Sequence, residues 1–251
     1  MNTLTVGGCK IPVTNNIQSN LTEIKLAIDW ASDNEVQLLV TPECALSGYL
    51  WAPRDQDPKI KELAEALEEI ENYSKEKKVD LILGTACYNN NGNWANTQRY
   101  IFNGKFVNEY SKNLLIDPEF IYTSERSFPP IINYNGVKIS GLICNDFWSN
   151  PVLFPGGSSQ LLRHLLQNEV QIVFVSAYVP KEPGPENSFY YWHLGQISNM
   201  GLYCQFATVV SDASTNVDGS PYTGQPACPV GIWDMSGKSI TGEKYFRHTF
   251  S

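Results

Sequence analysis

Four side chains suited to covalent catalysis lie at the ends of predicted structural elements. A carboxyl group, Glu43, stands in TPECALSGY, an ammonium group, Lys112, in YSKNLL, a second carboxyl group, Glu125, in TSERSF, and a thiol, Cys144, in GLICNDFW. Together they offer a nucleophile, a general base and a cation that can hold a developing negative charge. Each residue alone is more typical of core packing, a solvated turn or surface charge. The chemical prediction therefore depends on the combination.

A short strand and two hairpins are predicted to position three of these groups. The strand over 36–40 is apolar except for Gln37, as in strands buried on both faces, and Glu43 follows it closely. Hairpins with Asn-Gly turns are predicted over 100–110, just before Lys112, and over 131–144, where the return strand ends at the cysteine. Ligand chemistry in α/β folds gathers at the carboxyl ends of strands. Each of the three groups therefore stands where such chemistry can occur.

The remaining pattern predicts a large α/β domain with a mixed sheet. One amphipathic helix is expected within 11–36, with Asn20 and Glu23 as a capping box, and a second over 58–78, with Asp57 as its cap. Later segments alternate: strands over 79–85, 170–178 and 203–211, helices over 158–170 and 186–202, and a hairpin over 229–240. Helices alternating with strands favour parallel pairing, whereas the hairpins add antiparallel pairs.

The composition favours a single domain over residues 1–251. The chain has 251 residues, 42% of them apolar, and a formal net charge of −8. The acidic balance argues against nucleic acid as a partner, because binding to phosphates depends on clustered lysine and arginine. The first residues lack a signal-peptide pattern, and no run approaches the roughly 18 apolar residues of a membrane span. We expect a cytoplasmic protein that acts on a small molecule and does not bind a membrane.

The cysteines and histidines give no indication of a metal site. The six cysteines (Cys9, Cys44, Cys87, Cys144, Cys204, Cys228) and three histidines (His164, His193, His248) are scattered, without the paired spacing of zinc ligands. No disulfide framework is indicated either. We therefore expect chemistry without a metal or another cofactor.

Taken together, TPECALSGY, YSKNLLIDPE and GLICNDFW resemble the three ordered motifs of the nitrilase, or carbon-nitrogen hydrolase, superfamily. Glu43, Lys112 and Cys144 occur in the family order, and the separations of 69 residues (112 − 43) and 32 residues (144 − 112) are similar to those of the family. TSERSFPP resembles the segment that contributes a second glutamate, which maps to Glu125. The resemblance implies a nitrilase-like four-layer αββα sandwich with two mixed sheets, assembled as a homodimer or higher homo-oligomer.

The resemblance also implies a mechanism. Glu43 would accept the thiol proton, Cys144 would attack an amide-type carbon, and Lys112 with the backbone N–H of Asn145 would hold the oxyanion. A thioester would form and be hydrolysed, and Glu125 would orient the lysine or the substrate. An ordinary thiol and an ordinary carboxyl differ by about four pKa units, so burial of the glutamate and the nearby ammonium must narrow that gap.

The residues after the cysteine suggest a substrate class. Cys-Asn-Asp resembles the amidase and carbamoyl-hydrolase branches, so we expect a small linear amide or an N-carbamoyl amine as substrate. Where many relatives carry an arginine, this chain has Trp148. Tyr49, Phe147, Trp148 and the loop after Ala177 are candidate walls of the substrate pocket, and core packing is an equal alternative for the aromatic residues.

Other functions compete with this interpretation. The chain could be a nitrilase-fold binding or assembly protein with vestigial chemistry, although a scaffold has no need of all four reactive groups. It could transfer the acyl group from the thioester to an amine instead of water. A cysteine-histidine hydrolase that uses His164 or His193 is a third possibility.

Overall fold

The computed structural model describes residues 3–49, 58–88, 93–116, 119–148, 157–179, 188–216, 220, 228–242 and 244–250. The helices are α1 (Ile17–Asp33), α2 (Pro58–Lys77), α3 (Asn145–Trp148), α4 (Ser159–Gln167) and α5 (Ser188–Cys204), with a 3₁₀ turn at Glu119–Ile121. The strands are β1 (Leu4–Ile11), β2 (Leu38–Val40), β3 (Asp80–Tyr88), β4 (Trp94–Phe102), β5 (Lys105–Ser111), β6 (Ile132–Tyr134), β7 (Val137–Ile143), β8 (Ile172–Ala177), β9 (Ala207–Ala213), β10 (Gly231–Trp233), β11 (Ser239–Thr241) and β12 (Tyr245–Phe250).

The strands of the described residues form one curled sheet in the order β5-β4-β3-β2-β1-β9-β8-β7-β6. The central strands, from β3 through β1 to β7, pair in parallel, and β4, β5 and β6 pair antiparallel at the two ends. Strand β12 adds antiparallel to β1, and β10 adds antiparallel to β9. The predicted mixed sheet is confirmed. Because the central strands are parallel, the carboxyl ends of β2, β7 and β8 lie at a common edge.

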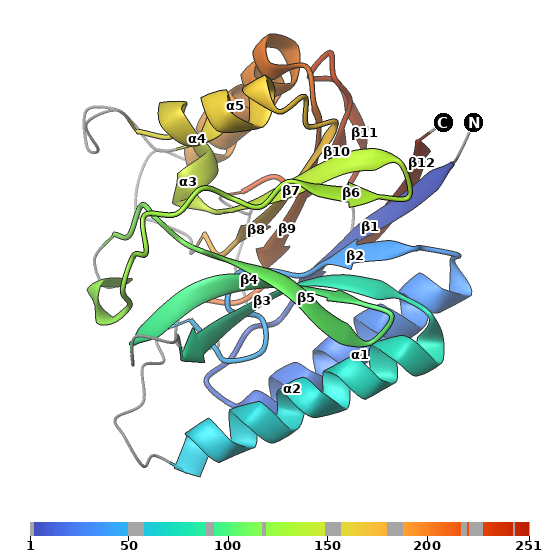
Figure 1. Ribbon diagram of the computed structural model, residues 1–251, viewed down its shortest axis with the longest axis vertical. Coiled ribbons are helices and arrows are strands. Elements are labelled where there is room, and N and C mark those ends of the chain that lie inside the picture. The colour runs from blue at the N-terminus through green and yellow to red at the C-terminus, as the bar shows by residue number, and fades with distance from the viewer. Residues whose placement is uncertain are drawn as a thin grey trace.

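Strand β1 divides the sheet into two halves that face each other. Its residues 6–8 pair with β2, whereas residues 10–11 pair with β9. Figure 1 shows α1 and α2 along the half that contains β2–β5, and α4 and α5 against the half that contains β7–β9. Leu38 and Val40 belong to the core cluster shared with β7–β9, whereas Leu39 belongs to the cluster beneath α1 and α2. This alternation gives the predicted four-layer αββα sandwich, with its two sheets continuous through β1.

The two halves approach closely at the centre of the sandwich. The Gln98 side chain of β4 donates to Ser176 Oγ at 2.8 Å and to the Leu142 carbonyl at 3.1 Å, both on the facing half. Gly141 is needed here, since a Cβ atom would lie 2.1 Å from Gln98 Oε1 and 2.6 Å from the Tyr100 hydroxyl. The close approach lets side chains from both halves contribute to one site.

Both Asn-Gly hairpins are confirmed. Asn103 and Gly104 have φ angles of 51° and 66°, and Asn135 and Gly136 have φ angles of 51° and 90°. Two successive positive φ angles match a type I′ turn, whose twist suits the flanking strands. These turns fix the strands that end just before Lys112 and Cys144.

The start of α1 differs from the prediction. Asn16 is the cap, because its side chain accepts a hydrogen bond from the Ser19 N–H at 2.8 Å. Asn20 is buried within the helix and donates to the carbonyls of Thr14 and Leu46 at 2.7 and 3.0 Å. The predicted capping box is therefore wrong. The better-placed side chain one turn earlier satisfies the helix end, and Asn20 ties the helix to the segment that follows Glu43.

The strands β1 and β12 and the short helix α3 were not expected from the sequence. The predicted cap of α2, Asp57, lies outside the described residues. Among the helices that the structure describes, none has the length and apolar character to cross a membrane. The described residues also include no cluster of three or more histidine, cysteine, aspartate or glutamate side chains arranged to hold a metal ion.

Candidate active site

The end of β8 fixes the backbone of two predicted site residues. The N–H of Glu43, just past β2, donates to the Ala177 carbonyl at 3.1 Å, and the N–H of Cys144, just past β7, donates to the Ser176 carbonyl at 2.8 Å. The glutamate and the cysteine therefore come from facing halves of the sandwich and meet at adjacent carbonyls of one strand. Strand β7 pairs in parallel with β8, whereas β2 pairs with β1 and β3, so the contact of Glu43 with Ala177 crosses between the two halves.

Lys112 completes a buried charge cluster. Its N–H donates to the Asn96 carbonyl at 2.8 Å, which continues the pairing of β5 with β4. Its ammonium Nζ donates to Glu43 Oε1 at 2.7 Å and to Glu119 Oε1 at 2.5 Å. All three side chains have an exposed fraction of 0%. Buried charges are tolerated when they are paired, and here one ammonium lies between two buried carboxyl groups.

The second glutamate beside the lysine is Glu119, and the expectation for Glu125 is corrected. Glu125 is exposed, whereas Glu119 is fully buried. The 3₁₀ turn directs the Glu119 side chain inward, where its Oε2 accepts from the Ile116 N–H at 3.0 Å and its Oε1 accepts from the Tyr49 hydroxyl at 2.8 Å. Apolar residues follow Glu119 in EFIY, whereas Glu125 has polar neighbours in TSERS. That contrast between apolar and polar neighbours was the signal in the sequence for which glutamate is buried.

The pKa values of the two carboxyl groups are shifted in opposite directions. Burial raises the pKa of Glu43 to about 8, and attraction to the Lys112 ammonium opposes this only partly. Burial also acts on Glu119, but the ammonium and the Ile116 N–H outweigh it and hold the pKa of Glu119 below its ordinary value. Burial alone would lower the pKa of Lys112, yet the two carboxylates raise it well above the ordinary value. The cluster therefore keeps the lysine charged and makes Glu43 the group able to accept a proton near neutral pH.

Cys144 occupies a strained turn at the end of β7. Its φ angle is +44°, and its carbonyl accepts a hydrogen bond from the Phe147 N–H at 2.9 Å, so the chain changes there from strand to α3. Burial and the nearby Glu43 raise the pKa of the thiol well above its ordinary value, while Lys112 lowers it by a smaller amount. The expected influence of the lysine is present, but burial dominates. The thiol is therefore neutral at rest.

Asp146 is a buried residue of this site that the sequence interpretation missed. It accepts hydrogen bonds from the Tyr110 hydroxyl at 2.8 Å and from the Leu114 N–H at 2.7 Å, and it also binds the Asn113 N–H. Burial raises its pKa to about 6. These contacts hold the residues on both sides of Lys112 against the turn that carries the cysteine. The Asp in ICNDFW was visible in the sequence, but its partners are distant along the chain.

Asn145, whose backbone N–H is the predicted oxyanion contact, lies next to the thiol along the chain. As the first residue of α3, it directly follows Cys144, and its side chain donates to the Leu114 carbonyl at 3.2 Å. This contact joins the start of α3 to the segment beyond Lys112. The backbone N–H of Asn145 therefore belongs to the same fixed turn as the thiol.

The predicted pocket-wall residues are tightly packed. Tyr49 stacks on Tyr178 with ring centroids 4.5 Å apart, and its hydroxyl binds Glu119. Phe147 and Trp148 are 1% and 3% exposed and belong to the main core. Ala177 is buried and supplies the carbonyl that binds the Glu43 N–H. For Phe147 and Trp148 the structure favours the alternative of core packing.

The histidines of the cysteine-histidine alternative have other contacts. His193 packs edge-on against Trp148 with centroids 4.7 Å apart, and its Nδ1 lies 2.8 Å from the Phe189 carbonyl. His164 stacks on Phe128, and its Nε2 lies 3.2 Å from the Pro129 carbonyl. These contacts favour structural roles for both rings.

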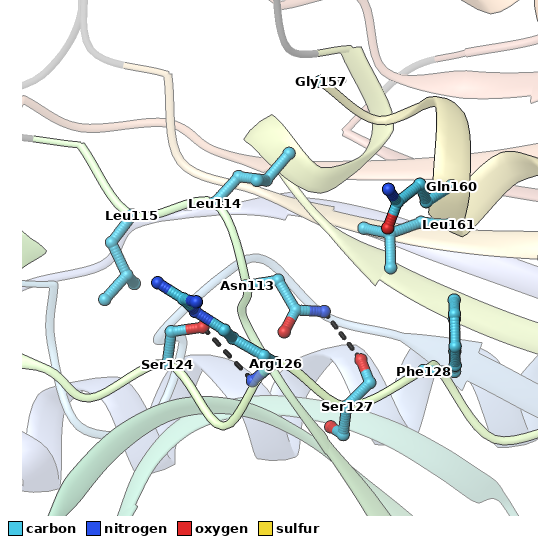
Figure 2. A pocket seen from close by; sticks show the side chains of 10 residues that line it. All are labelled: Asn113, Leu114, Leu115, Ser124, Arg126, Ser127, Phe128, Gly157, Gln160 and Leu161. Carbon is cyan, nitrogen blue, oxygen red and sulfur yellow. Dashed lines mark hydrogen bonds between the residues drawn. The ribbon is translucent and has the colours of Figure 1, made fainter. Parts of the chain in front are cut away.

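A pocket of about 560 Å³ adjoins the segment that follows Lys112. It is lined by Asn113, Leu114, Leu115, Ser124, Arg126, Ser127, Phe128, Gly157, Gln160 and Leu161 (Figure 2). The side chain of Asn113 forms part of its wall and donates to the Ser127 carbonyl at 2.7 Å. Glu43, Lys112 and Cys144 are not among the lining residues. The pocket is therefore next to the lysine-bearing segment, and the charge cluster is separate from it.

Comparison with known proteins identifies the family of the chain. The family model for carbon-nitrogen hydrolases matches residues 3–208, and the chain therefore belongs to the carbon-nitrogen hydrolase family. A curated relative, the glutamine-dependent NAD(+) synthetase of Aquifex aeolicus, is 28% identical over 140 residues, which is 53% of this chain and 24% of that protein. The chain thus matches about a quarter of the length of that relative.

Solved structures show the same fold at low sequence identity. The glutamine-dependent NAD+ synthetase from Acinetobacter baumannii matches with a TM-score of 0.79 and 17% identity, covering 100% of this chain and 46% of that one. An amidase from Nesterenkonia sp. matches with a TM-score of 0.75 and 18% identity, covering 98% of this chain and 89% of the amidase. These similarities confirm the nitrilase-like architecture.

Proposed function

We propose that this chain is a cysteine-dependent amidohydrolase that cleaves a non-peptide C–N bond in a small linear amide or N-carbamoyl amine. The observation that carries the proposal is the unused hydrogen-bonding capacity in the buried cluster. Glu43 Oε2 is buried and has no hydrogen-bond partner. An ammonium has three donors, and Lys112 uses two of them on Glu43 and Glu119. One acceptor and one donor are thus available to reacting atoms.

The first half of the reaction follows from these groups. The thiol of Cys144 attacks the amide carbon while its proton passes to Glu43, whose raised pKa makes its carboxylate a stronger proton acceptor than an ordinary glutamate. The carbonyl oxygen becomes an oxyanion, held by Lys112 Nζ and the backbone N–H of Asn145. Glu43 then protonates the nitrogen, the C–N bond breaks, and ammonia or an amine leaves a thioester on the cysteine.

Hydrolysis of the thioester uses the same groups in reverse. Glu43 accepts a proton from water, the resulting hydroxide attacks the acyl carbon, and the C–S bond breaks. Glu43 then returns the proton to the departing sulfur, which restores the thiol and releases the acid product. Glu119 remains charged throughout and keeps the lysine in place, so it acts as a positioning residue in the role first expected of Glu125. A vestigial site is disfavoured, because three buried charged groups destabilise a fold that has no use for them.

The solved neighbours support covalent chemistry at the cysteine. In one solved mutant of the Nesterenkonia amidase, the acetamide moiety of fluoroacetamide is covalently added at the active-site cysteine. The NAD synthetases among the relatives are glutamine-dependent. A second candidate function is therefore release of ammonia from a carboxamide side chain, such as that of glutamine, for use by a separate acceptor. Transfer of the acyl group to an amine instead of water is a further variant of the same thioester chemistry.

The test is ammonia or amine release combined with intact-mass analysis. The wild-type chain is incubated with short amides, N-carbamoyl amines and glutamine, and the mass is searched for an acyl adduct. We expect one class to release ammonia and the adduct to be lost in Cys144→Ala. Cys204→Ala is the matched control, because this partly exposed thiol on α5 lies outside the site and should retain wild-type turnover. Ammonia release by Cys144→Ala at the wild-type rate would exclude the proposal.

A further inference from the structure

Asp212, near the carboxyl end of β9, is a buried carboxylate that the proposed reaction does not use. It is 0% exposed and lies beside Ala177 in the register of β9 with β8. Its Oδ1 accepts a hydrogen bond from the Val179 N–H at 3.0 Å, which fixes the orientation of the carboxylate. Its Oδ2 is buried and has no hydrogen-bond partner. A buried carboxylate oxygen without a donor is unfavourable unless a ligand supplies one.

The sheet register places this carboxylate at the proposed site. Ile143 pairs with Ser176, and Ser176 pairs with Ser211, so Cys144 and Asp212 follow one residue later on strands that flank β8. Both lie beside Ala177, whose carbonyl also receives the Glu43 N–H. The catalytic thiol, the base and Asp212 are therefore gathered around the end of a single strand.

The electrostatic influences on Cys228 agree with the placement of Asp212 near Cys144. The buried thiol of Cys228 has its pKa raised by burial and, to a smaller extent, by Asp212 and by Cys144, so it lies near both groups. The Tyr178 N–H is hydrogen-bonded to the Cys144 thiol, and the next N–H in the chain, that of Val179, binds Asp212. Two consecutive peptide groups thus connect the nucleophile with the carboxylate.

We infer that Asp212 determines specificity by binding a protonated amine of the substrate through Oδ2, so that the preferred substrates are short amides that carry an ammonium group. This inference rests on the proposed amidase function and adds the substrate class. An ammonium would supply a charge-assisted hydrogen bond to the oxygen that lacks a donor. Burial raises the pKa of Asp212 to about 7, while Lys10, its register partner on β1, opposes that rise. A bound ammonium would favour the charged carboxylate further.

The spacing limits the length of the substrate. The backbones of Cys144 and Asp212 are two strand spacings, about 10 Å, apart. A substrate that places its acyl carbon at the thiol and its ammonium at Asp212 Oδ2 must therefore be short. β-Alaninamide, with two carbons between the acyl carbon and the ammonium nitrogen, is a probe of this kind.

The experiment compares β-alaninamide with propionamide, which has the same carbon chain without the amine. We expect wild type to have a higher kcat/KM for β-alaninamide. In Asp212→Asn, which retains an acceptor for the Val179 N–H, the ratio of the two kcat/KM values should fall by about 10-fold to 100-fold. Glu109→Gln, which removes one partly buried carboxylate from β5, is the control and should preserve the wild-type ratio.

Binding separates failure of this inference from failure of the proposed function. Calorimetry with Cys144→Ala measures the affinity for each amide without turnover. The inference is supported if Cys144→Ala binds β-alaninamide more tightly than propionamide and if adding Asp212→Asn abolishes that difference. This holds even if wild type hydrolyses neither amide, because lack of hydrolysis counts only against the proposed function. The inference is overturned if Cys144→Ala binds the two amides with equal affinity, or if adding Asp212→Asn weakens the binding of both amides equally. The first comparison needs no variant of Asp212, so the test stands even if that variant does not fold.

Discussion

Glu43 and Glu119 are two buried glutamates on one ammonium, yet the structure gives them opposite proton affinities. Glu43 receives both of its donors, from Lys112 and the Asn96 side chain, on Oε1, and its Oε2 has none. Glu119 receives donors on both oxygens, including a backbone N–H. The pKa of Glu43 is therefore raised by burial, whereas that of Glu119 is lowered. Both carboxyl groups contact the lysine, which lowers both pKa values, and Glu119 has a backbone N–H donor from Ile116 in addition.

The largest effect is expected when the base is removed. Glu43→Gln retains the size and the contacts of the side chain but cannot accept the thiol proton. We expect kcat to fall between about 100-fold and 10,000-fold. Steady-state ammonia release measures this change, and circular dichroism checks that the fold is retained. A decrease smaller than that of Glu119→Gln would reverse the assignment of roles.

A smaller effect and a shifted pH profile are expected for Glu119→Gln. The variant removes a negative charge that contributes to raising the pKa of Glu43. Glu43 must be deprotonated to act as a base, so kcat/KM rises with pH through its pKa, which is about 8 in the wild-type chain. The acid limb should therefore move to lower pH, and kcat should fall by about 10-fold as the lysine loses one anchor. A profile between about pH 5 and 10 measures the shift, and movement to higher pH would contradict this account.

The smallest effect is expected for Tyr49→Phe, which removes one donor from Glu119 and leaves the two other contacts in place. We expect the free energy of unfolding to fall by about 1–3 kcal/mol, because a buried acceptor loses a hydrogen bond. Urea denaturation gives the value. Tyr73→Phe is the matched control, since the Tyr73 hydroxyl donates to the partly exposed Asp29 carboxylate at 2.7 Å, far from the site in α2. Equal losses in both variants would show that burial of the acceptor is unimportant.

Local signals predicted much of the fold. Apolar periodicity located α1 and the short strand before Glu43, and the Asn-Gly turns at 103–104 and 135–136 located both hairpins. Strand β12 was not anticipated, because three polar residues, 247–249, occupy its middle and it is stabilised by pairing with β1, at the other end of the chain. Pairing between distant segments leaves little trace in a local pattern.

The sequence by itself determined the three reactive groups that meet, Glu43, Lys112 and Cys144, because their types and order along the chain are local facts. Only the tertiary structure decided that Glu119 replaces Glu125 beside the lysine and that Asp146 and Asp212 belong to the same region. The reason is physical. Which carboxyl group is buried, and how many donors reach it, depends on strands and turns that are brought together from distant parts of the chain, and no spacing in the sequence records those contacts.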